Sequence, residues 1–172
     1  MASGCHFVFF LCLTSGLFIA GTITESATDN SDEQVSGCPA GWTQFGSRCF
    51  IFYRQARVWA DAEHICISIG GNLASIHSAD ENTFLSDLIL RVSGARHHTW
   101  IGGYDAVREG TWLWSDGSKF RYFRWYIRQP DNHGGKEHCI EMNYGAPGPF
   151  TVKVGCCTEK RRGILFKWQT TH

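Results

Sequence analysis

The sequence predicts a single exported α+β domain that is held together by disulfide bonds. Its 172 residues suit one domain and a leader. Helical periodicity is confined to the first half, whereas the second half holds short apolar segments separated by Gly, Asp and Pro. Early helices followed by strands and loops are typical of the α+β class. Six cysteines follow the leader, and this number in a small exported domain is typical of a disulfide framework.

The first 21 residues are interpreted as a signal peptide. Their apolar run, 6–21, is preceded by only five residues, too short a tail for a cytosolic domain. Cleavage after Gly16 would meet the preference for small residues through Thr14 and Gly16, and later cleavage sites stay open. A membrane anchor, which needs about 20 apolar residues, is less well supported. We therefore expect a secreted, extracellular protein without a membrane span.

Residues 22–37 are expected to form a polar, acidic spacer or a propeptide. They are rich in Thr, Ser and acids and offer almost nothing to bury. The folded domain is expected over 38–172. The whole chain has 16 Lys and Arg against 16 Asp and Glu, so its charge gives no reason to expect a nucleic-acid partner.

The first folded element is expected to be a hairpin over 42–53. This segment interleaves aromatic and polar residues, and Gly46 with Ser47 offers a turn between two short strands. A disulfide between Cys38 and Cys49 could staple the hairpin.

Two amphipathic helices are expected next. Apolar residues recur at helical spacing over 58–69, and two glycines then supply a stop. A strand is expected over 72–76. Ser78 and Glu81 match a capping box at the start of the second helix, whose apolar face continues to Ile89.

The second half is expected to contribute short strands. Strand segments are predicted at 100–101, 112–114 and 139–143, and 164–166 has the composition of an apolar last strand. Most aromatic residues, including the Trp pair in 112–114, are assigned to core packing because a small domain with long loops needs large rings to bury enough surface.

Five segments resemble the C-type lectin-like family in order and spacing. They are CPAGWTQFGSRCF (38–50), WADAEHICISIGGNLASIHSADEN (59–82), WIGGYD (100–105), EGTWLWSDG (109–117) and QPDNHGGKEHC (129–139). The resemblance implies the C-type lectin-like fold, with two helices, small antiparallel sheets and a long loop region that binds calcium and sugar.

The same resemblance implies a primary calcium and sugar site at Gln129, Asp131 and Glu137. In the family, side-chain oxygens on either side of a cis proline, here Pro130, hold the ion, and two sugar hydroxyls complete its shell. Gln-Pro-Asp in place of Glu-Pro-Asn is the galactose-type arrangement. Calcium accepts about six to eight oxygen ligands, so these residue types suit it.

Two further features of the loop follow from the family pattern. An auxiliary calcium site would use Asp105, Glu109 and Asn132. Galactose binders usually add an aromatic ring against the sugar, but His133 stands where a Trp is expected. Trp125 or Tyr126 could substitute, although core packing is the favoured role for both.

The C-terminal segment from about residue 146 departs from the family pattern. The family completes its calcium site with a Trp-Asn-Asp triplet, and alignment of Phe150 with that Trp puts Thr151 and Val152 at the ligand positions. Valine cannot ligate a cation and threonine offers a neutral hydroxyl. The resemblance thus predicts a calcium site with an incomplete set of ligands.

The chain also lacks the final cysteine that the family joins to its first helix, so Cys66 has no usual partner. The pairs expected from the family are Cys38–Cys49 and Cys139–Cys156. Cys66 and Cys157 would then be either joined to each other or available to another chain. Six cysteines allow fifteen connectivities.

The favoured function is a secreted lectin that binds glycans, with terminal galactose as the candidate sugar. The alternative is a calcium-independent module that presents the same loops to a protein or, as in some fish relatives, to ice. Weak single-site lectins commonly rely on multivalency, so an oligomer is compatible with this function, although no residue predicts one.

An enzyme is the weakest interpretation. His138, Cys139 and Glu141 lie close together in sequence, but Cys139 is better explained as half of a disulfide. The sequence contains neither an HExxH nor a GxSxG motif.

Overall fold

The computed structural model describes residues 37–144 and 151–168. The predicted signal peptide and all but the last residue of the predicted spacer lie outside the described residues, as does the start of the atypical C-terminal segment. The elements are β1 (Thr43–Phe45), β2 (Arg48–Arg57), α1 (Trp59–Ser68), β3 (Asn72–Leu73), α2 (Ala79–Ser93), β4 (Thr99–Tyr104), β5 (Leu113–Trp114), a 3₁₀ turn η1 (His133–Gly135), β6 (Glu137–Met142), β7 (Val152–Cys156) and β8 (Arg161–Trp168).

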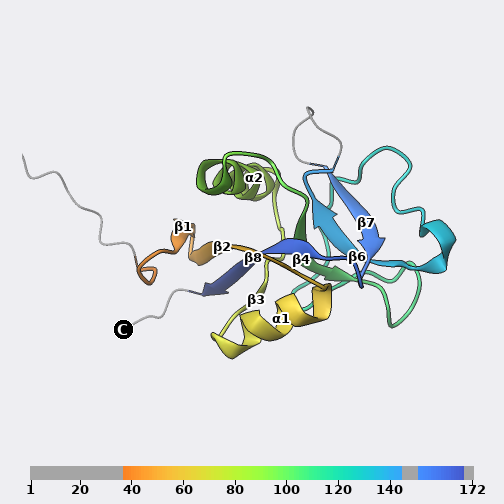
Figure 1. The fold of residues 1–172 in the computed structure, drawn as a ribbon, viewed down its shortest axis with the longest axis horizontal. Helices are drawn as coiled ribbons and strands as arrows, with labels where there is room; N and C mark the ends of the chain where they lie inside the picture. Colours follow the sequence, from red (N-terminus) through yellow and green to blue (C-terminus); the bar gives the residue numbers. More distant parts are fainter. Residues whose placement is uncertain (1–36, 145–150, 169–172) are drawn as a thin grey trace, which may run out of the picture. The chain divides into compact units, whose positions relative to one another are not determined.

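The strands form a mixed sheet in the order β1-β2-β8-β4-β6-β7, with β3 paired to β8 and β5 paired to β4. Only the β4–β8 pairing is parallel among the strand pairs of the described chain. Strand β8 inserts between β2 and β4, so the end of the domain is hydrogen-bonded to its beginning. The helices α1 and α2 lie on opposite sides of the β2–β8 pair (Figure 1). This arrangement confirms the predicted α+β class.

Helix α2 begins at the predicted cap. The Ser78 hydroxyl accepts a hydrogen bond from the Glu81 amide at 3.1 Å, and Gly94 ends the helix in the left-handed region at φ 79°. The capping box is not reciprocal, however. The Glu81 carboxylate accepts from the His77 amide at 2.8 Å and pairs with Arg48. The second member of the motif therefore serves the core as well as the helix end.

The predicted strands are present, with differences in length. Strands β4 and β8 cover the predicted segments, β5 begins one residue later than predicted, at Leu113, and β6 ends one residue earlier, at Met142. Strand β3 stops at Leu73, although the backbone of Ala74 still bonds to β8 and β4. The predicted core role of the aromatic residues is confirmed for Trp114, which is buried, and for Trp112 and Trp125, which pack against the main core cluster. In the described part of the chain, no helix is long and apolar enough to cross a membrane.

The disulfides confirm one prediction and correct another. Cys38 is bonded to Cys49, with 5.5 Å between the Cα atoms. Cys139 is bonded to Cys157, with a Cα separation of 5.3 Å, so the predicted Cys139–Cys156 pair is wrong. The register explains why. Cys139 lies opposite Gly155, and side chains alternate along a strand, so Cys157 shares the face of residue 155 whereas Cys156 points the other way.

The remaining described cysteines are not bonded to each other. Cys66 is buried in α1, where its thiol donates to the Ala62 carbonyl at 3.0 Å. Cys156 lies 3.1 Å from the Thr158 hydroxyl. The predicted alternative of a Cys66–Cys157 bond is therefore also wrong, because Cys157 is used by Cys139.

Candidate functional site

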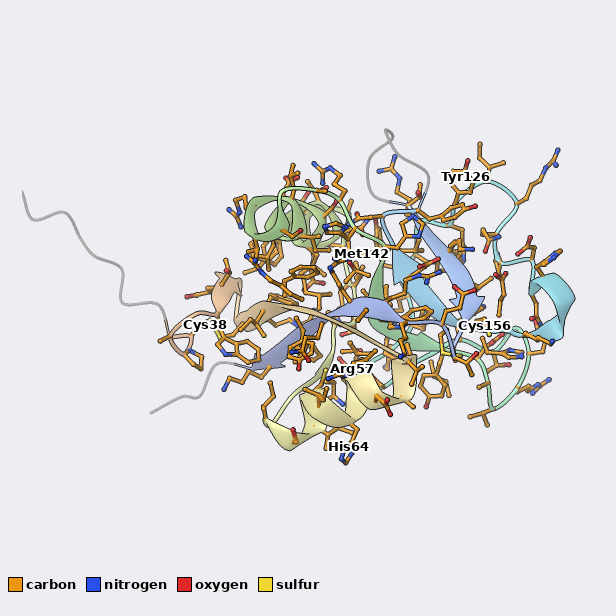
Figure 2. All side chains as sticks on the ribbon, viewed as in Figure 1. Cys38, Arg57, His64, Tyr126, Met142 and Cys156 are labelled. Atoms are coloured by element: carbon orange, nitrogen blue, oxygen red, sulfur yellow. A yellow bond between two sulfur atoms is a disulfide. The ribbon has the colours of Figure 1, made fainter. Side chains whose placement is uncertain are left out.

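The candidate site is built on the long loop between β5 and β6 and on the edge strand β7. The loop, cyan in Figure 1, lies next to β6 and β7 at one end of the sheet. Figure 2 shows Tyr126 beside the start of β7 and Cys156 near its end. The Gln129–Pro130 peptide is cis, as the family resemblance implies, and Arg128 and Asn132 on either side adopt positive φ. Non-glycine residues in this region of φ are uncommon and are concentrated at functional sites.

The three residues predicted for the primary site, here called the primary group, are Gln129, Asp131 and Glu137. The structure connects them through β7. Gln129 donates from Nε2 to Asp131 Oδ1 at 2.7 Å and accepts at Oε1 from the Val154 amide at 3.0 Å. Glu137 Oε1 lies 3.6 Å from Lys153 Nζ. Gln129 and Glu137 thus contact two consecutive residues of β7, Val154 and Lys153.

The residues predicted for the auxiliary site, here called the auxiliary group, are Asp105, Glu109 and Asn132. They are also brought together. Asn132 donates to the Glu109 carboxylate and accepts at Oδ1 from the Glu137 amide at 2.9 Å. Asp105, which is 1% exposed, accepts from the Gly110 amide at 2.8 Å. The two groups are therefore joined through Asn132 and the first residue of β6.

His138 completes the auxiliary group and was not predicted as part of it. Its Nδ1 lies 3.0 Å from Asp105 Oδ1 and 3.5 Å from Glu109 Oε2. These three side chains can place one ligand atom each within 4.8 Å of one another. Successive side chains of a β-strand point to opposite faces, so His138, which follows Glu137 in β6, must face away from the primary group. This alternation could have indicated that His138 lies in the auxiliary group.

Strand β7 presents a different residue to the site from those predicted. The Thr151 hydroxyl donates to the Tyr144 carbonyl at 2.7 Å, and Val152 is buried in the main core cluster. The side chain that reaches the primary group is that of Lys153, whose Nζ also lies 3.7 Å from Glu141 Oε1 and 4.4 Å from the centre of the Tyr144 ring. The family alignment places Thr151 and Val152 at the ligand positions of the primary site. In the structure neither side chain reaches that site, and β7 turns Lys153 toward the carboxylates instead.

The residues of the primary group, as they are arranged, do not fit calcium. Calcium takes about six to eight oxygen ligands and is attracted by negative charge. The Gln129 carbonyl oxygen already accepts from a backbone amide, and an ammonium group lies beside Glu137. A divalent cation next to that ammonium would be repelled.

The auxiliary group fits calcium poorly for a different reason. Asp105 and Glu109 offer carboxylate oxygens, but the third ligand atom of this cluster is the imidazole nitrogen of His138. Imidazole suits Zn²⁺ and similar metals, whereas Ca²⁺ prefers oxygen ligands throughout.

The order of the elements, the cis Gln129–Pro130 peptide and the paired groups of loop residues agree with the comparisons with known proteins. The family model described as "Lectin C-type domain" matches residues 55–164. The chain belongs to the C-type lectin family. The family resemblance predicted from the sequence is therefore confirmed, and the relatives of this lectin domain belong to a family of binding proteins.

Three similar proteins show how widely this lectin fold is used. The galactose-specific lectin nattectin of Thalassophryne nattereri is 52% identical over 144 residues, which cover 84% of this chain and 86% of nattectin. The solved structure of a Ca²⁺-dependent type II antifreeze protein in its Ca²⁺-free form is 34% identical with a TM-score of 0.69, over 76% of this chain and 99% of that chain. A calcium-independent type II antifreeze protein is 32% identical with a TM-score of 0.68, over 76% and 94%. Because calcium-dependent and calcium-independent proteins share the fold, the fold alone does not decide whether this chain uses calcium.

Proposed function

We propose that this chain is a secreted lectin that binds galactose-type glycans at the primary group. The observation that carries the proposal is the hydrogen bond of 2.7 Å between Gln129 Nε2 and Asp131 Oδ1. Asn132 of the same loop accepts from the Glu137 amide at 2.9 Å. Asp131 is exposed, and Gln129 and Glu137 are partly exposed, so a ligand can reach all three. The similarity to a galactose-specific lectin, together with the galactose-type order of amide and carboxylate, supports this choice of sugar.

The chemistry is recognition without catalysis. Sugar hydroxyls both donate and accept hydrogen bonds, so carboxylate oxygens of Asp131 and Glu137 can accept from them while the Gln129 amide can do either. Hydrogen bonds to charged groups are about twice as strong as neutral ones, which suits the capture of a strongly hydrated ligand.

Trp125 and Tyr126 are both partly exposed, but Trp125 packs against the main core cluster, whereas Tyr126 meets the Tyr144 ring edge-on, with 5.2 Å between the ring centres. The Tyr126 carbonyl accepts from the Gln129 backbone amide at 2.9 Å. Tyr126 is therefore the ring that we assign to the apolar face of the sugar.

Affinity chromatography tests the proposal. The secreted full-length protein is applied to galactosyl resin and eluted with free galactose or free mannose. We expect retention and elution by galactose alone. Gln129→Glu with Asp131→Asn should shift the preference toward mannose, because it creates the other arrangement of the family. Asp80→Asn, an exposed carboxylate in α2, is the matched control and should leave retention unchanged. No retention of the wild type on galactose would refute the proposal.

The second candidate is a calcium-independent module that binds a protein or ice through the same loops. The similarity to a calcium-independent type II antifreeze protein favours it. Thermal hysteresis of the purified protein, together with no retention on galactosyl resin, would favour ice binding over sugar binding.

A further inference from the structure

We infer that the ammonium group of Lys153 replaces calcium as the cation of the primary group, so that the site is assembled without a metal. The part of the inference that concerns sugar rests on the proposed function. The part that concerns the cation does not, because it follows from the contacts of Lys153 alone.

Lys153 lies between two carboxylates. Its Nζ is 3.6 Å from Glu137 Oε1 and 3.7 Å from Glu141 Oε1, and its side chain is 16% exposed. Glu141 is fully buried, and its other oxygen, Oε2, accepts from Arg161 at 2.8 Å. Two carboxylates that share one partly buried cation are the arrangement that a metal ion would otherwise have to provide.

Glu141 gives the ammonium a buried partner. Its Oε1 is buried and has no hydrogen-bond partner among the described residues. Arg161 pairs with the other oxygen, and the ammonium of Lys153 is the cationic group paired with Oε1, where it offsets part of the cost of burial. Lys153 thus pairs with the buried carboxylate of Glu141 on the core side and with the partly exposed carboxylate of Glu137 on the loop side.

The oxygen atoms of the loop already have partners within the protein. Gln129 Oε1 accepts from the Val154 amide, Asp131 Oδ1 accepts from Gln129 Nε2, and Asn132 Oδ1 accepts from the Glu137 amide. A calcium ion would have to share these oxygen atoms with the donors that they already accept from, and it would approach a group of the same sign of charge. The geometry therefore holds the loop in place by contacts that need no ion.

The ammonium also retains donors for a ligand. Both of its carboxylate neighbours lie beyond 3.5 Å, and no hydrogen bond from Nζ to an acceptor is formed within the described part of the chain. An ammonium has three N–H donors, so sugar hydroxyl oxygens can accept from it. Lys153 would then be the residue that binds the hydroxyl oxygens which the ion binds in calcium-dependent relatives.

The test compares Lys153→Gln, which removes the charge, with Lys153→Arg, which keeps it, and with the exposed control Lys119→Gln. The thermal midpoint of each full-length protein is measured with chelator and at 10 mM Ca²⁺. We expect no shift for wild type, Lys153→Arg and Lys119→Gln. Lys153→Gln should gain about 3 °C with calcium, because Glu137 loses its counter-ion and extracellular calcium modules bind at about 10⁻⁴ to 10⁻³ M.

Galactose affinity is measured on the same proteins with chelator present. We expect wild-type binding to persist in chelator and to fall by tenfold or more in Lys153→Gln, with Lys153→Arg close to wild type. A calcium-dependent rise in the wild-type midpoint would overturn the inference, and so would a Lys153→Gln protein that responds to calcium and galactose as the wild type does. If Lys153→Gln does not fold, calorimetric titration of the wild type with Ca²⁺ decides, and bound calcium overturns the inference. Should the wild type ignore both calcium and galactose, the sugar proposal fails while the cation inference stands.

Discussion

Two ion pairs, Arg48–Glu81 at the start of α2 and Lys153–Glu137 beside the long loop, each join a basic side chain to a glutamate but differ in burial. The side chains of Arg48 and Glu81 are 7% and 4% exposed, whereas those of Lys153 and Glu137 are each 16% exposed. Arg48 also donates to the Ser75 hydroxyl at 2.9 Å, so it is held from several sides. The ammonium of Lys153 lies 3.6 Å and 3.7 Å from its two carboxylate neighbours, beyond hydrogen-bond distance. The comparison suggests that the first pair completes the core and that the second is left open for a ligand.

The two pairs should respond differently to the loss of one partner. Burial lowers the pKa of Arg48, and Glu81 counteracts that effect. A buried carboxylate left without its guanidinium has little access to water, whereas Glu137 can be solvated when Lys153 is removed. Substitutions in the two regions should therefore lower the free energy of unfolding by different amounts, most in the buried pair and least beside the loop.

The largest effect is expected for Arg48→Met. Removing the guanidinium leaves Glu81 as an uncompensated buried charge, which should lower the free energy of unfolding by about 3–5 kcal/mol. Chemical denaturation measures this loss. Arg91→Met, at an exposed position in the last turn of α2, is the control and should cost less than about 1 kcal/mol. Galactose binding per folded molecule should not change, and a selective loss of sugar binding in Arg48→Met would show that the two regions are not independent.

The second effect concerns the disulfide that joins β6 to the end of β7. Cys139 and Cys157 are 18 residues apart, so Cys157→Ser should lower the free energy of unfolding by about 3 kcal/mol under non-reducing conditions. Cys156→Ser should have almost no effect. The reverse order of these two values would show that Cys139 pairs with Cys156 after all.

This pair of cysteines also shows where reasoning from sequence stops. The helices, the hairpin and the Cys38–Cys49 bond could be predicted because each is set by residues close together in the chain. The choice between Cys156 and Cys157 depends on the register between β6 and β7, which residues from two separate segments decide. Adjacent cysteines carry no local signal for that choice.

The same limit applies to the candidate site. The primary and auxiliary groups could be predicted because family motifs mark their residues, and the structure brings each set together. Lys153 and His138 carry no such mark. Only the strand geometry turns Lys153 toward Glu137 and His138 toward Asp105. A motif shows which residues are retained, but it does not show which basic residue has replaced an ion.

The third prediction separates stability from binding. Glu137→Gln removes the outer carboxylate from Lys153, and a partly exposed ion pair contributes about 0.2–1 kcal/mol. The free energy of unfolding should therefore fall by no more than about 1 kcal/mol, while galactose affinity should fall by about tenfold or more because a charged acceptor for the sugar is replaced by a neutral one. Denaturation and galactose titration of the same preparation measure both. An unfolding loss as large as that of Arg48→Met would mean that Glu137 belongs to the core.

The last prediction concerns the two free thiols among the described residues and involves no change in stability. Burial raises the pKa of the Cys66 thiol far above its ordinary value, with Glu63 adding to the effect, so almost no thiolate forms in the native state. Hydrogen bonds with Thr158 lower the pKa of Cys156, which increases its thiolate fraction at a given pH. Iodoacetamide at pH 8 without reductant should therefore label Cys156 in the native protein, and Cys66 only after denaturation. Peptide mapping by mass spectrometry reads out both sites. Because the thiolate is the reactive form, labelling of Cys156 should rise with pH through its lowered pKa and level off, and native labelling of Cys66 would show that α1 opens and exposes the core.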